Sequence, residues 1–191
     1  MRMFNDALRG WPAGIGLSRR GMLGVFTFSS LLLAACSAGV QTTKVGDFEV
    51  APDFEVEAFG NINYEPGELV SVSDFEGKPV VVNFWYPSCP PCRLEMPDFE
   101  ATFNKHKEDG VEFLGVQSLI LDTVEDGQEF IDEFGITYAV GPDADGSVLI
   151  DYGIVNFPST VFLDKNHEIV RVWAGILTAE KLDEIIEPLI Q

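Results

Sequence analysis

The chain has 191 residues, enough for one domain with a sizeable hydrophobic core and terminal extensions. Its formal net charge is -19; residues 1–35 hold four Arg and one Asp, so the rest of the chain carries about -22. Such an acidic body repels nucleic-acid phosphates and anionic membrane surfaces, so we expect neither as a partner. Three cysteines, at positions 36, 89 and 92, are too few for a disulfide framework.

Residues 1–35 are predicted to be a targeting segment outside the folded domain. Arg19 and Arg20 precede the apolar run Met22–Ala35, which is short for a membrane span of about 20 residues. The run ends in small residues before Cys36. This pattern resembles the lipobox of bacterial lipoproteins, which implies that Cys36 becomes the lipidated first residue of the mature protein. The arginine pair also resembles a twin-arginine export signal; twin-arginine export, ordinary secretion and an uncleaved signal anchor remain open. All three interpretations place the part of the chain after residue 35 at the extracytoplasmic face of a bacterial membrane.

The segment after Cys36 is small and polar up to Gly46, without periodicity, which predicts a flexible tether at residues 36–46. The folded domain is then expected at residues 47–191. Asp53–Phe59 alternates polar and apolar residues, as a half-buried strand does, and Leu69–Val72 is a second short strand after turn signals.

The next stretch is the centre of the sequence. Residues 80–86 form a mostly apolar run between prolines, which predicts a buried central strand. Cys89 and Cys92 follow, separated by two prolines, and a helix begins there. A C-x-x-C at a helix start is suited to thiol redox chemistry, because the partial positive charge of the helix N-terminus favours a thiolate. We expect Cys89 to lie outside the helix, exposed, as the attacking thiolate, and Cys92 to be the covered resolving thiol.

The remaining elements follow in chain order. The helix after Cys92 is expected to run to about Lys107, and a strand covers Val111–Val116. A second helix is capped by Asp122-Thr123 and ends at Gly135. The buried face of the first helix is expected to contain Leu94, Phe99 and Phe103, and that of the second Phe130, Ile131 and Phe134. After the second helix we expect a short extended piece at Ile136–Val140, a turn at Asp143–Gly146 and helical turns at Val148–Tyr152.

The C-terminal part is predicted to be a hairpin and a helix. Ser159–Asp164 and Ile169–Trp173 are strands around a turn, and Thr178 caps the last helix. Leu182, Ile185, Ile186 and Leu189 recur at helical spacing. The order β-α-β-α-β-β-α implies an α/β sandwich with helices on both faces of a mixed sheet.

These elements resemble a known fold family. Phe84-Trp85 before Cys-Pro-Pro-Cys, Pro97 five residues after Cys92, and Phe157-Pro158-Ser159-Thr160 before a strand are similar to the thioredoxin fold. The closer resemblance, over about Val45–Gln191, is to the membrane-anchored thiol-disulfide oxidoreductases of the TlpA/ResA type, within the AhpC/TSA-Redoxin superfamily. It implies a strand pair before the central strand and a strand–helix insertion before a cis-proline.

The resemblance also implies roles for individual residues. Pro158 is the family's cis-proline, with the backbone of Phe157 and Pro158 facing the disulfide where a substrate chain can pair. Asn83 stands where cytosolic thioredoxins place a buried Asp. Glu95, on the helical face of Cys92, is expected to tune the cysteines and to help move their protons. Trp85 and Phe157 are candidates for substrate contact or for packing.

Two stretches depart from the family pattern. Tyr86-Pro87-Ser88 stands where the family more often has Ala-Ser/Thr-Trp, which leaves the partner's identity open. Residues 117–121 are more apolar than usual, and belong either to the core or to a docking groove. His106 and His167 are predicted to be plain surface residues.

The direction of the chemistry is predicted to be reductive. The two prolines between the cysteines supply neither a charge nor an N–H to the sulfur, and a nearby Glu95 carboxylate would disfavour a thiolate. We therefore expect a reductase of disulfides in exported proteins, with apocytochrome c as one substrate of the family. It would draw electrons from a membrane thiol donor and is expected to need no cofactor or metal.

Three alternatives remain. The first is a peroxiredoxin-like peroxidase. That family has a Thr three residues before its reactive cysteine, whereas the residue three before Cys92 in this chain is Cys89. A copper-binding chaperone of the same fold resembles C-x-x-x-C, one residue longer than the spacing here. A lipoprotein with a purely structural disulfide is the third.

Overall fold

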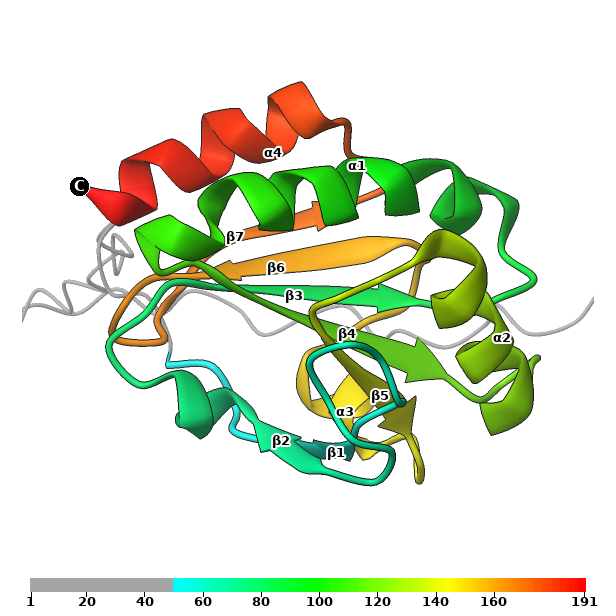
Figure 1. Ribbon diagram of the computed structural model, residues 1–191. Coiled ribbons are helices and arrows are strands. Elements are labelled where there is room, and N and C mark those ends of the chain that lie inside the picture. Colours follow the sequence, from blue (N-terminus) through cyan, green and yellow to red (C-terminus); the bar gives the residue numbers. More distant parts are fainter. Residues whose placement is uncertain (1–49) are drawn as a thin grey trace, which may run out of the picture. The chain divides into compact units, whose positions relative to one another are not determined.

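A computed structural model describes residues 50–191 (Figure 1). Its main sheet has five strands in the order β5-β4-β3-β6-β7. β3 and β4 are parallel, as are β4 and β5, whereas β6 is antiparallel to both β3 and β7. The predicted mixed sheet is thus confirmed. The strands are β3 (Val80–Trp85), β4 (Glu112–Ser118), β5 (Ala139–Asp143), β6 (Ser159–Leu163) and β7 (Ile169–Ala174).

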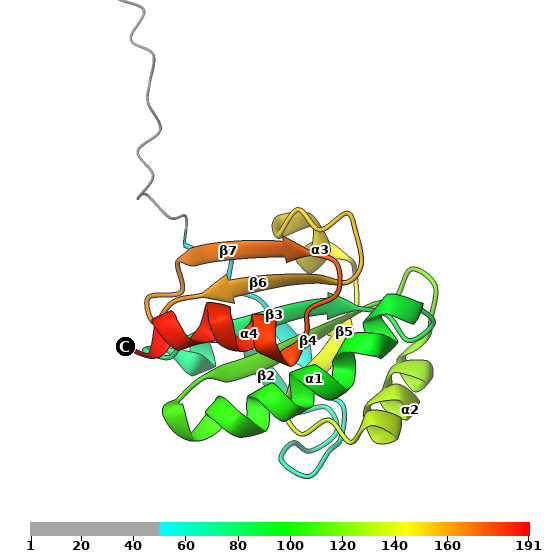
Figure 2. The same ribbon diagram turned by 90° about the horizontal axis from the view of Figure 1, so that it is seen from above.

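Helices lie on both faces of this sheet, as predicted (Figures 1 and 2). One face carries α1 (Pro90–His106), α2 (Val124–Phe134) and α4 (Ala179–Ile186). The other carries α3 (Ser147–Asp151) and the expected N-terminal strand pair, β1 (Glu55–Glu57) and β2 (Leu69–Ser71). Short 3-10 helices complete the described part: η1 (Val72–Phe75), η2 (Lys107–Asp109) and η3 (Glu187–Ile190).

Side-chain alternation along β3 divides the core into two layers. Val81 and Trp85 point to the α1 face and pack with its aromatic cluster. Val80, Val82 and Phe84 point to the opposite face. All six residues of β3 are buried, which explains why this central strand lacks the alternating polarity of a half-exposed one.

The predicted helix caps are confirmed for α2 and α4. The Thr123 side chain accepts from Asp126 N–H in a capping box, and Gly135 ends α2 with φ 61°. The Thr178 side chain caps α4. The extended piece expected at Ile136–Val140 is instead β5, three residues later. Ile136 donates its N–H to Ile131 O and so still belongs to the end of α2.

The buried face of α1 differs from the prediction at Leu94, which is 70% exposed. The inward stripe contains polar members, because Glu95 and His106 face the core between apolar residues. Phe99 and Phe103 are buried as predicted, but a search for apolar positions alone selects Leu94 in the first turns instead of Glu95. The buried residues are Cys92, Glu95, Met96, Phe99, Thr102, Phe103 and His106.

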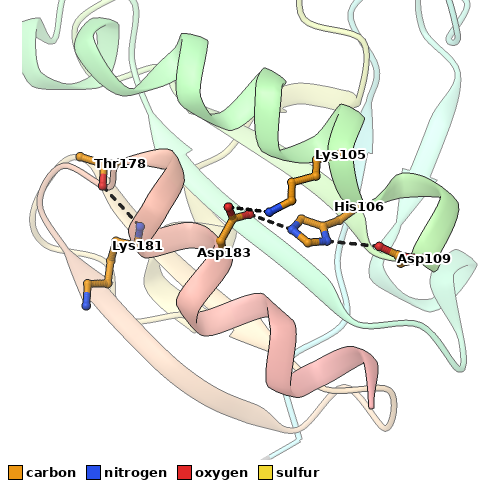
Figure 3. A network of polar contacts seen from close by, with 6 residues as sticks. All are labelled: Lys105, His106, Asp109, Thr178, Lys181 and Asp183. Atoms are coloured by element: carbon orange, nitrogen blue, oxygen red, sulfur yellow. Dashed lines mark hydrogen bonds and ion pairs between the residues drawn. The ribbon is translucent and has the colours of Figure 1, made fainter.

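The two histidines are not plain surface residues. His106 is buried, with Nε2 2.8 Å from Asp183 Oδ1 and Nδ1 3.4 Å from Asp109 Oδ2 (Figure 3). Lys105 Nζ donates to the other oxygen of Asp183 at 2.7 Å. These contacts bind the C-terminal end of α1 to α4. His167 is half-buried, and its Nε2 lies 3.1 Å from Phe75 O.

The predicted signal segment, Cys36 and the tether lie outside the described residues. Within residues 50–191, no helix is long and apolar enough to cross a bilayer.

Candidate active site

The two cysteines lie where β3 leads into α1. Cys89 is the N-cap of α1, with φ -80° and ψ 108°, and Cys92 lies in the first turn. Pro90 and Pro91 occupy the first helical positions, where a missing N–H removes no helical hydrogen bond. Cys89 and Cys92 form a disulfide with their Cα atoms 5.3 Å apart.

The helix start supplies one hydrogen bond to sulfur. The Cys92 N–H donates to Cys89 Sγ at 3.2 Å. The prediction that the two prolines offer no N–H holds for Pro90 and Pro91, but the next residue provides one. A Cys89 thiolate would therefore gain a backbone donor in addition to the partial charge of the helix end.

Cys89 is not exposed, contrary to the prediction. It is 1% exposed and Cys92 is 0% exposed, because both belong to the hydrophobic cluster between the sheet and α1. Cys89 lies outside the helix, as expected, but the loop before it folds against that cluster. In this disulfide state a partner can reach Cys89 Sγ only if the side chains around it move.

Glu95 lies one turn after Cys92 on the same face of α1, and it is fully buried. Its Oε1 accepts from Asn83 Nδ2 at 3.0 Å, and its Oε2 accepts from the backbone N–H of Leu177 at 3.1 Å. Asn83 comes from β3, and Leu177 from the segment before α4. An ordinary exposed helix carboxylate is thereby excluded as the interpretation of Glu95.

Burial changes the charge of Glu95. Desolvation raises the pKa of its carboxyl from the ordinary value of 4.5 to about 8, although the hydrogen bonds from Asn83 and Leu177 act to lower it. At pH 7 the Glu95 carboxyl is therefore mainly protonated. The expected repulsion between a Glu95 carboxylate and a cysteine thiolate thus applies to the ionised form, which becomes the major one above about pH 8.

Asn83 connects Glu95 to the strand that follows Pro158. It faces Thr160 across the β3–β6 ladder, and its Nδ2 also donates to Thr160 Oγ1 at 3.2 Å. The Asn83 Oδ1 has no hydrogen-bond partner. A half-turn of this amide would point Oδ1 at Glu95, where it could accept from the neutral carboxyl. The pair can thus satisfy both protonation states of Glu95.

Trp85 belongs to the core and not to the substrate surface. It is 1% exposed and stacks on Phe130, with ring centroids 4.4 Å apart. Substrate contact by Trp85, one of its two predicted interpretations, is therefore corrected to packing. The cause is the inward orientation of the last residue of β3, which places the indole under α2.

Phe157 and Pro158 form the segment that leads into β6. The peptide bond between them is cis, as the resemblance implied. Pro158 is buried, and its carbonyl accepts from Gly175 N–H at 2.8 Å. Phe157 is half-buried and meets Tyr86 edge to face, with ring centroids 5.2 Å apart.

The loop before Cys89 is held by a second contact. Asp122 Oδ2 accepts from the Ser88 N–H at 3.1 Å and from its hydroxyl at 2.8 Å. On the other side of the pair, Arg93 forms an ion pair with Glu133, and its guanidinium lies over the Phe130 ring. The basic side chain next to Cys92 is thus directed to α2.

The described residues contain no group of three or more His, Cys, Asp or Glu side chains that could hold a metal ion. The site between residues 83 and 177 consists of a disulfide-bonded cysteine pair, a buried acid and the amide that binds it. This set of groups can exchange disulfides and move one proton.

A model of the AhpC/TSA family matches residues 48–172. The chain belongs to the AhpC/TSA family. Within that family it is similar to the thiol-disulfide oxidoreductase ResA of Oceanobacillus iheyensis, with 38% identity over 141 residues, 73% of this chain and 70% of the relative. ResA of Halalkalibacterium halodurans is 35% identical over 121 residues, 63% of this chain and 68% of the relative.

A solved structure agrees with these relatives. The thioredoxin domain of a thiol-disulfide oxidoreductase from Bacteroides vulgatus matches with a TM-score of 0.63 and 30% identity, covering 75% of this chain and 96% of that chain. This AhpC/TSA-family member is thus a ResA-like thiol-disulfide oxidoreductase with a thioredoxin fold, as its resemblance implied.

The sequence did not indicate every part of the site. The Leu177 N–H is a backbone group, so no residue type marks it. Thr160 was part of the quoted Phe-Pro-Ser-Thr run, but its pairing with Asn83 follows from strand register alone. Ser88, which donates to Asp122, belongs to one of the stretches where the sequence departs from the family.

Proposed function

We propose that this ResA-like protein reduces disulfides in exported polypeptides at the extracytoplasmic face of a bacterial membrane. Residues 1–35 would be its signal peptide, Cys36 its lipid-anchored residue, residues 36–46 a tether, and residues 47–191 the catalytic domain. Cys89 is the attacking thiol, Cys92 the resolving thiol and Glu95 the proton acceptor.

One observation carries this proposal: a buried acid with a pKa of about 8 lies one helical turn from the resolving cysteine. Because burial raises the pKa of the Glu95 carboxyl to about 8, this group can both accept and release a proton beside Cys92 near neutral pH. A purely structural disulfide exchanges no proton, so it would not require a buried acid beside it.

The reaction proceeds in two exchanges. The Cys89 thiolate attacks one sulfur of the substrate disulfide; a mixed disulfide forms, the substrate S–S bond breaks, and the first substrate thiolate leaves and takes a proton. In molecules whose Glu95 is ionised, Cys92 then passes its proton to that carboxylate and attacks Cys89 Sγ. The Cys89–Cys92 disulfide forms, the mixed disulfide breaks, and the second substrate thiolate leaves. Two electrons pass to the substrate.

Electrostatics support the reductive direction. The described residues contain 7 Lys and Arg and 28 Asp and Glu, so a thiolate at Cys89 lies in a strongly negative protein. The guanidinium of Arg93 donates to Pro87 O in the cysteine loop, but its charge is offset by the ion pair with Glu133. A thiolate beside a cation that is already paired gains less stabilisation, and the couple is correspondingly more reducing. The backbone N–H of Cys92 acts in the opposite sense but is shared by any helix N-cap cysteine.

The partners follow from this chemistry. The substrates would be exported proteins with an accessible disulfide, apocytochrome c among them, and a membrane protein with reactive thiols would restore the dithiol. The ResA relatives support disulfide exchange as the reaction. No cofactor is required in either half of the cycle.

The direct test is the reduction potential of the Cys89–Cys92 pair, measured by equilibration with glutathione or dithiothreitol. We expect a value nearer to about -270 mV than to about -120 mV, and a value above about -150 mV would overturn the reductive direction. In cells, the Cys92→Ser variant should retain substrates on Cys89 as mixed disulfides, and Cys89→Ser should retain none. Consumption of hydrogen peroxide that persists in Cys92→Ser would favour the peroxidase alternative.

A further inference from the structure

An open groove lies beside the cysteine loop. It has a volume of about 730 Å³ and is bounded by residues 118–120 after β4, by α3, and by the segment before Pro158. Three of the four most exposed large apolar side chains of the described residues line it: Val155 (83% exposed), Ile150 (76%) and Ile120 (74%). The fourth, Ile62, is elsewhere.

This concentration of exposed apolar side chains is informative. Single exposed apolar residues are ordinary, but a contiguous apolar patch on a protein surface marks an interaction site. The groove lies at the carboxyl ends of the parallel strands β4 and β5, the edge at which open α/β sheets bind their ligands. Of the two interpretations of residues 117–121, the core applies to Gln117, which is buried and does not line the groove, whereas Ser118, Leu119 and Ile120 line it.

Two contacts join the groove to Cys89. Phe157 lines the groove and meets Tyr86, three residues before Cys89, edge to face. The loop that carries Ile120 continues to Asp122, whose carboxylate accepts both hydrogen bonds from Ser88. A polypeptide in the groove would therefore lie next to the residues that support the loop before Cys89.

The charge around the groove restricts its occupant. None of its thirteen lining residues is basic. Asp145 is exposed at its edge, and hydrogen bonds from Ser147 hold the pKa of that carboxyl below its ordinary value, so it is an anion. A second copy of this acidic protein would meet the groove with like charge, whereas a segment with a basic residue would be attracted.

We propose that this groove binds an extended segment of the substrate polypeptide, with a large apolar side chain near its disulfide-bonded cysteine and a lysine or arginine next to that side chain. The proposal rests on the proposed reductase function and adds to it a sequence preference. Val155, Ile150 and Ile120 hold the apolar side chain, Asp145 attracts the basic one, and the neighbouring cysteine is brought to Tyr86 and Ser88.

The test uses the reduced full chain and mixed disulfides of 5-thio-2-nitrobenzoate, whose release is followed by absorbance in a single turnover. Three peptides share one cysteine: the first has Leu and Lys beside it, the second Ser in place of Leu, and the third Glu in place of Lys. The mixed disulfide with 2-mercaptoethanol carries the same chromophore without a peptide. The variants are Ile120→Ser with Val155→Ser, Asp145→Asn, and Ile62→Ser as the matched exposed control.

We expect the unmodified protein to reduce the first peptide about tenfold faster than the second, as burial of one apolar side chain predicts. It should also prefer Lys to Glu. The double variant should lose the Leu preference, Asp145→Asn should weaken the Lys preference, and Ile62→Ser should retain both. All variants should reduce the 2-mercaptoethanol compound equally, because exposed side chains contribute little to folding.

Each other outcome has one meaning. If no variant reduces even the 2-mercaptoethanol compound, the reductase function itself is wrong. The groove proposal is overturned if that compound is reduced but the unmodified protein does not prefer the Leu peptide. It is also overturned if the double variant retains the preference for Leu. Sedimentation of the same samples decides about a second copy: a dimer that the double variant converts to a monomer would assign the groove to self-association and overturn the proposal.

Discussion

The interface between α1 and the α4 region contains two partly or fully buried carboxyl groups with opposite properties. Glu95, near the start of α1, meets only neutral donors, Asn83 Nδ2 and Leu177 N–H. Asp183, at the other end, meets Lys105 and His106 (Figure 3). Burial raises the pKa of Glu95 to about 8. Burial also acts to raise the pKa of Asp183, but its hydrogen bonds and the two basic neighbours outweigh this and lower it.

The difference shows how one helix pair can serve two purposes. An acid with basic partners stays ionised and joins the helices at all ordinary pH values. An acid with neutral donors only is held in place but can gain or lose its proton near neutrality. The end of α1 with the titrating acid is the end that carries the cysteines, so position along the helix separates chemistry from stability.

The largest expected effect comes from Glu95→Gln, which keeps the shape but removes the titration. We expect disulfide reduction at pH 7 to slow by about 100-fold, the size of a lost general-base contribution, and its pH dependence near 8 to flatten. Single-turnover kinetics from pH 6 to 9 measures both. A rate within twofold of the unmodified protein would show that Glu95 does not accept the Cys92 proton.

The same variant changes stability in a pH-dependent way. Folded Glu95 binds its proton more tightly than unfolded Glu95, so its contribution is fully present below about pH 4.5 and is lost as pH rises to about 8. The unmodified protein should lose on the order of 5 kcal/mol of unfolding free energy over this window relative to Glu95→Gln. Urea unfolding at pH 5 and pH 8.5 measures the difference. If the unfolding free energy changes equally with pH in the two proteins, the raised pKa of Glu95 is contradicted.

Asp183→Asn should weaken the contacts between the C-terminal end of α1 and α4. Loss of the charged hydrogen bond to buried His106 should reduce the unfolding free energy by about 2 kcal/mol, with disulfide reduction unchanged. Asp109→Asn is the matched control, because its 3.4 Å contact to the same ring is longer and more exposed. The Asp183 contribution is lost as pH falls through its lowered pKa. A slower reaction in Asp183→Asn would show that the two ends are coupled.

Asn83→Leu should give the smallest change. Removal of the Asn83 donor withdraws a group that lowers the pKa of Glu95, so that pKa should rise. The rate–pH profile should move in the same direction. Thr160→Val removes only the next hydrogen bond in the chain and should shift the profile less. A shift toward lower pH in Asn83→Leu would contradict the assigned direction of that hydrogen bond.

The sequence predicted the parts of the fold that depend on local patterns. The central strand, the C-x-x-C at a helix start, the Thr123 and Thr178 caps and the Gly135 helix end all follow from residue types at fixed spacing. Pro158 followed from resemblance, since residue type does not determine the isomer of a prolyl bond.

The errors arose where tertiary contacts decide. Leu94 is exposed because Glu95 occupies the inward position of that turn, and Glu95 is inward because Asn83 and Leu177, 12 and 82 residues away, receive it. His106 is buried for the same reason, through Asp183. Cys89 is covered by the fold of the loop before it. In each case a polar side chain is satisfied by a distant partner that a local pattern does not reveal.

The ladder register of β3 has a consequence for how this protein can be altered. Asn83 is opposite Gly115 on one side and Thr160 on the other, and its side chain points to α1. Adding or deleting one residue between Val80 and Asn83 would turn the amide to the opposite face and place a valine or phenylalanine against Glu95. Length changes should be tolerated better in the turn before Lys78, whereas a single inserted residue inside this strand would separate the acid from its amide and shift the loop that carries Cys89.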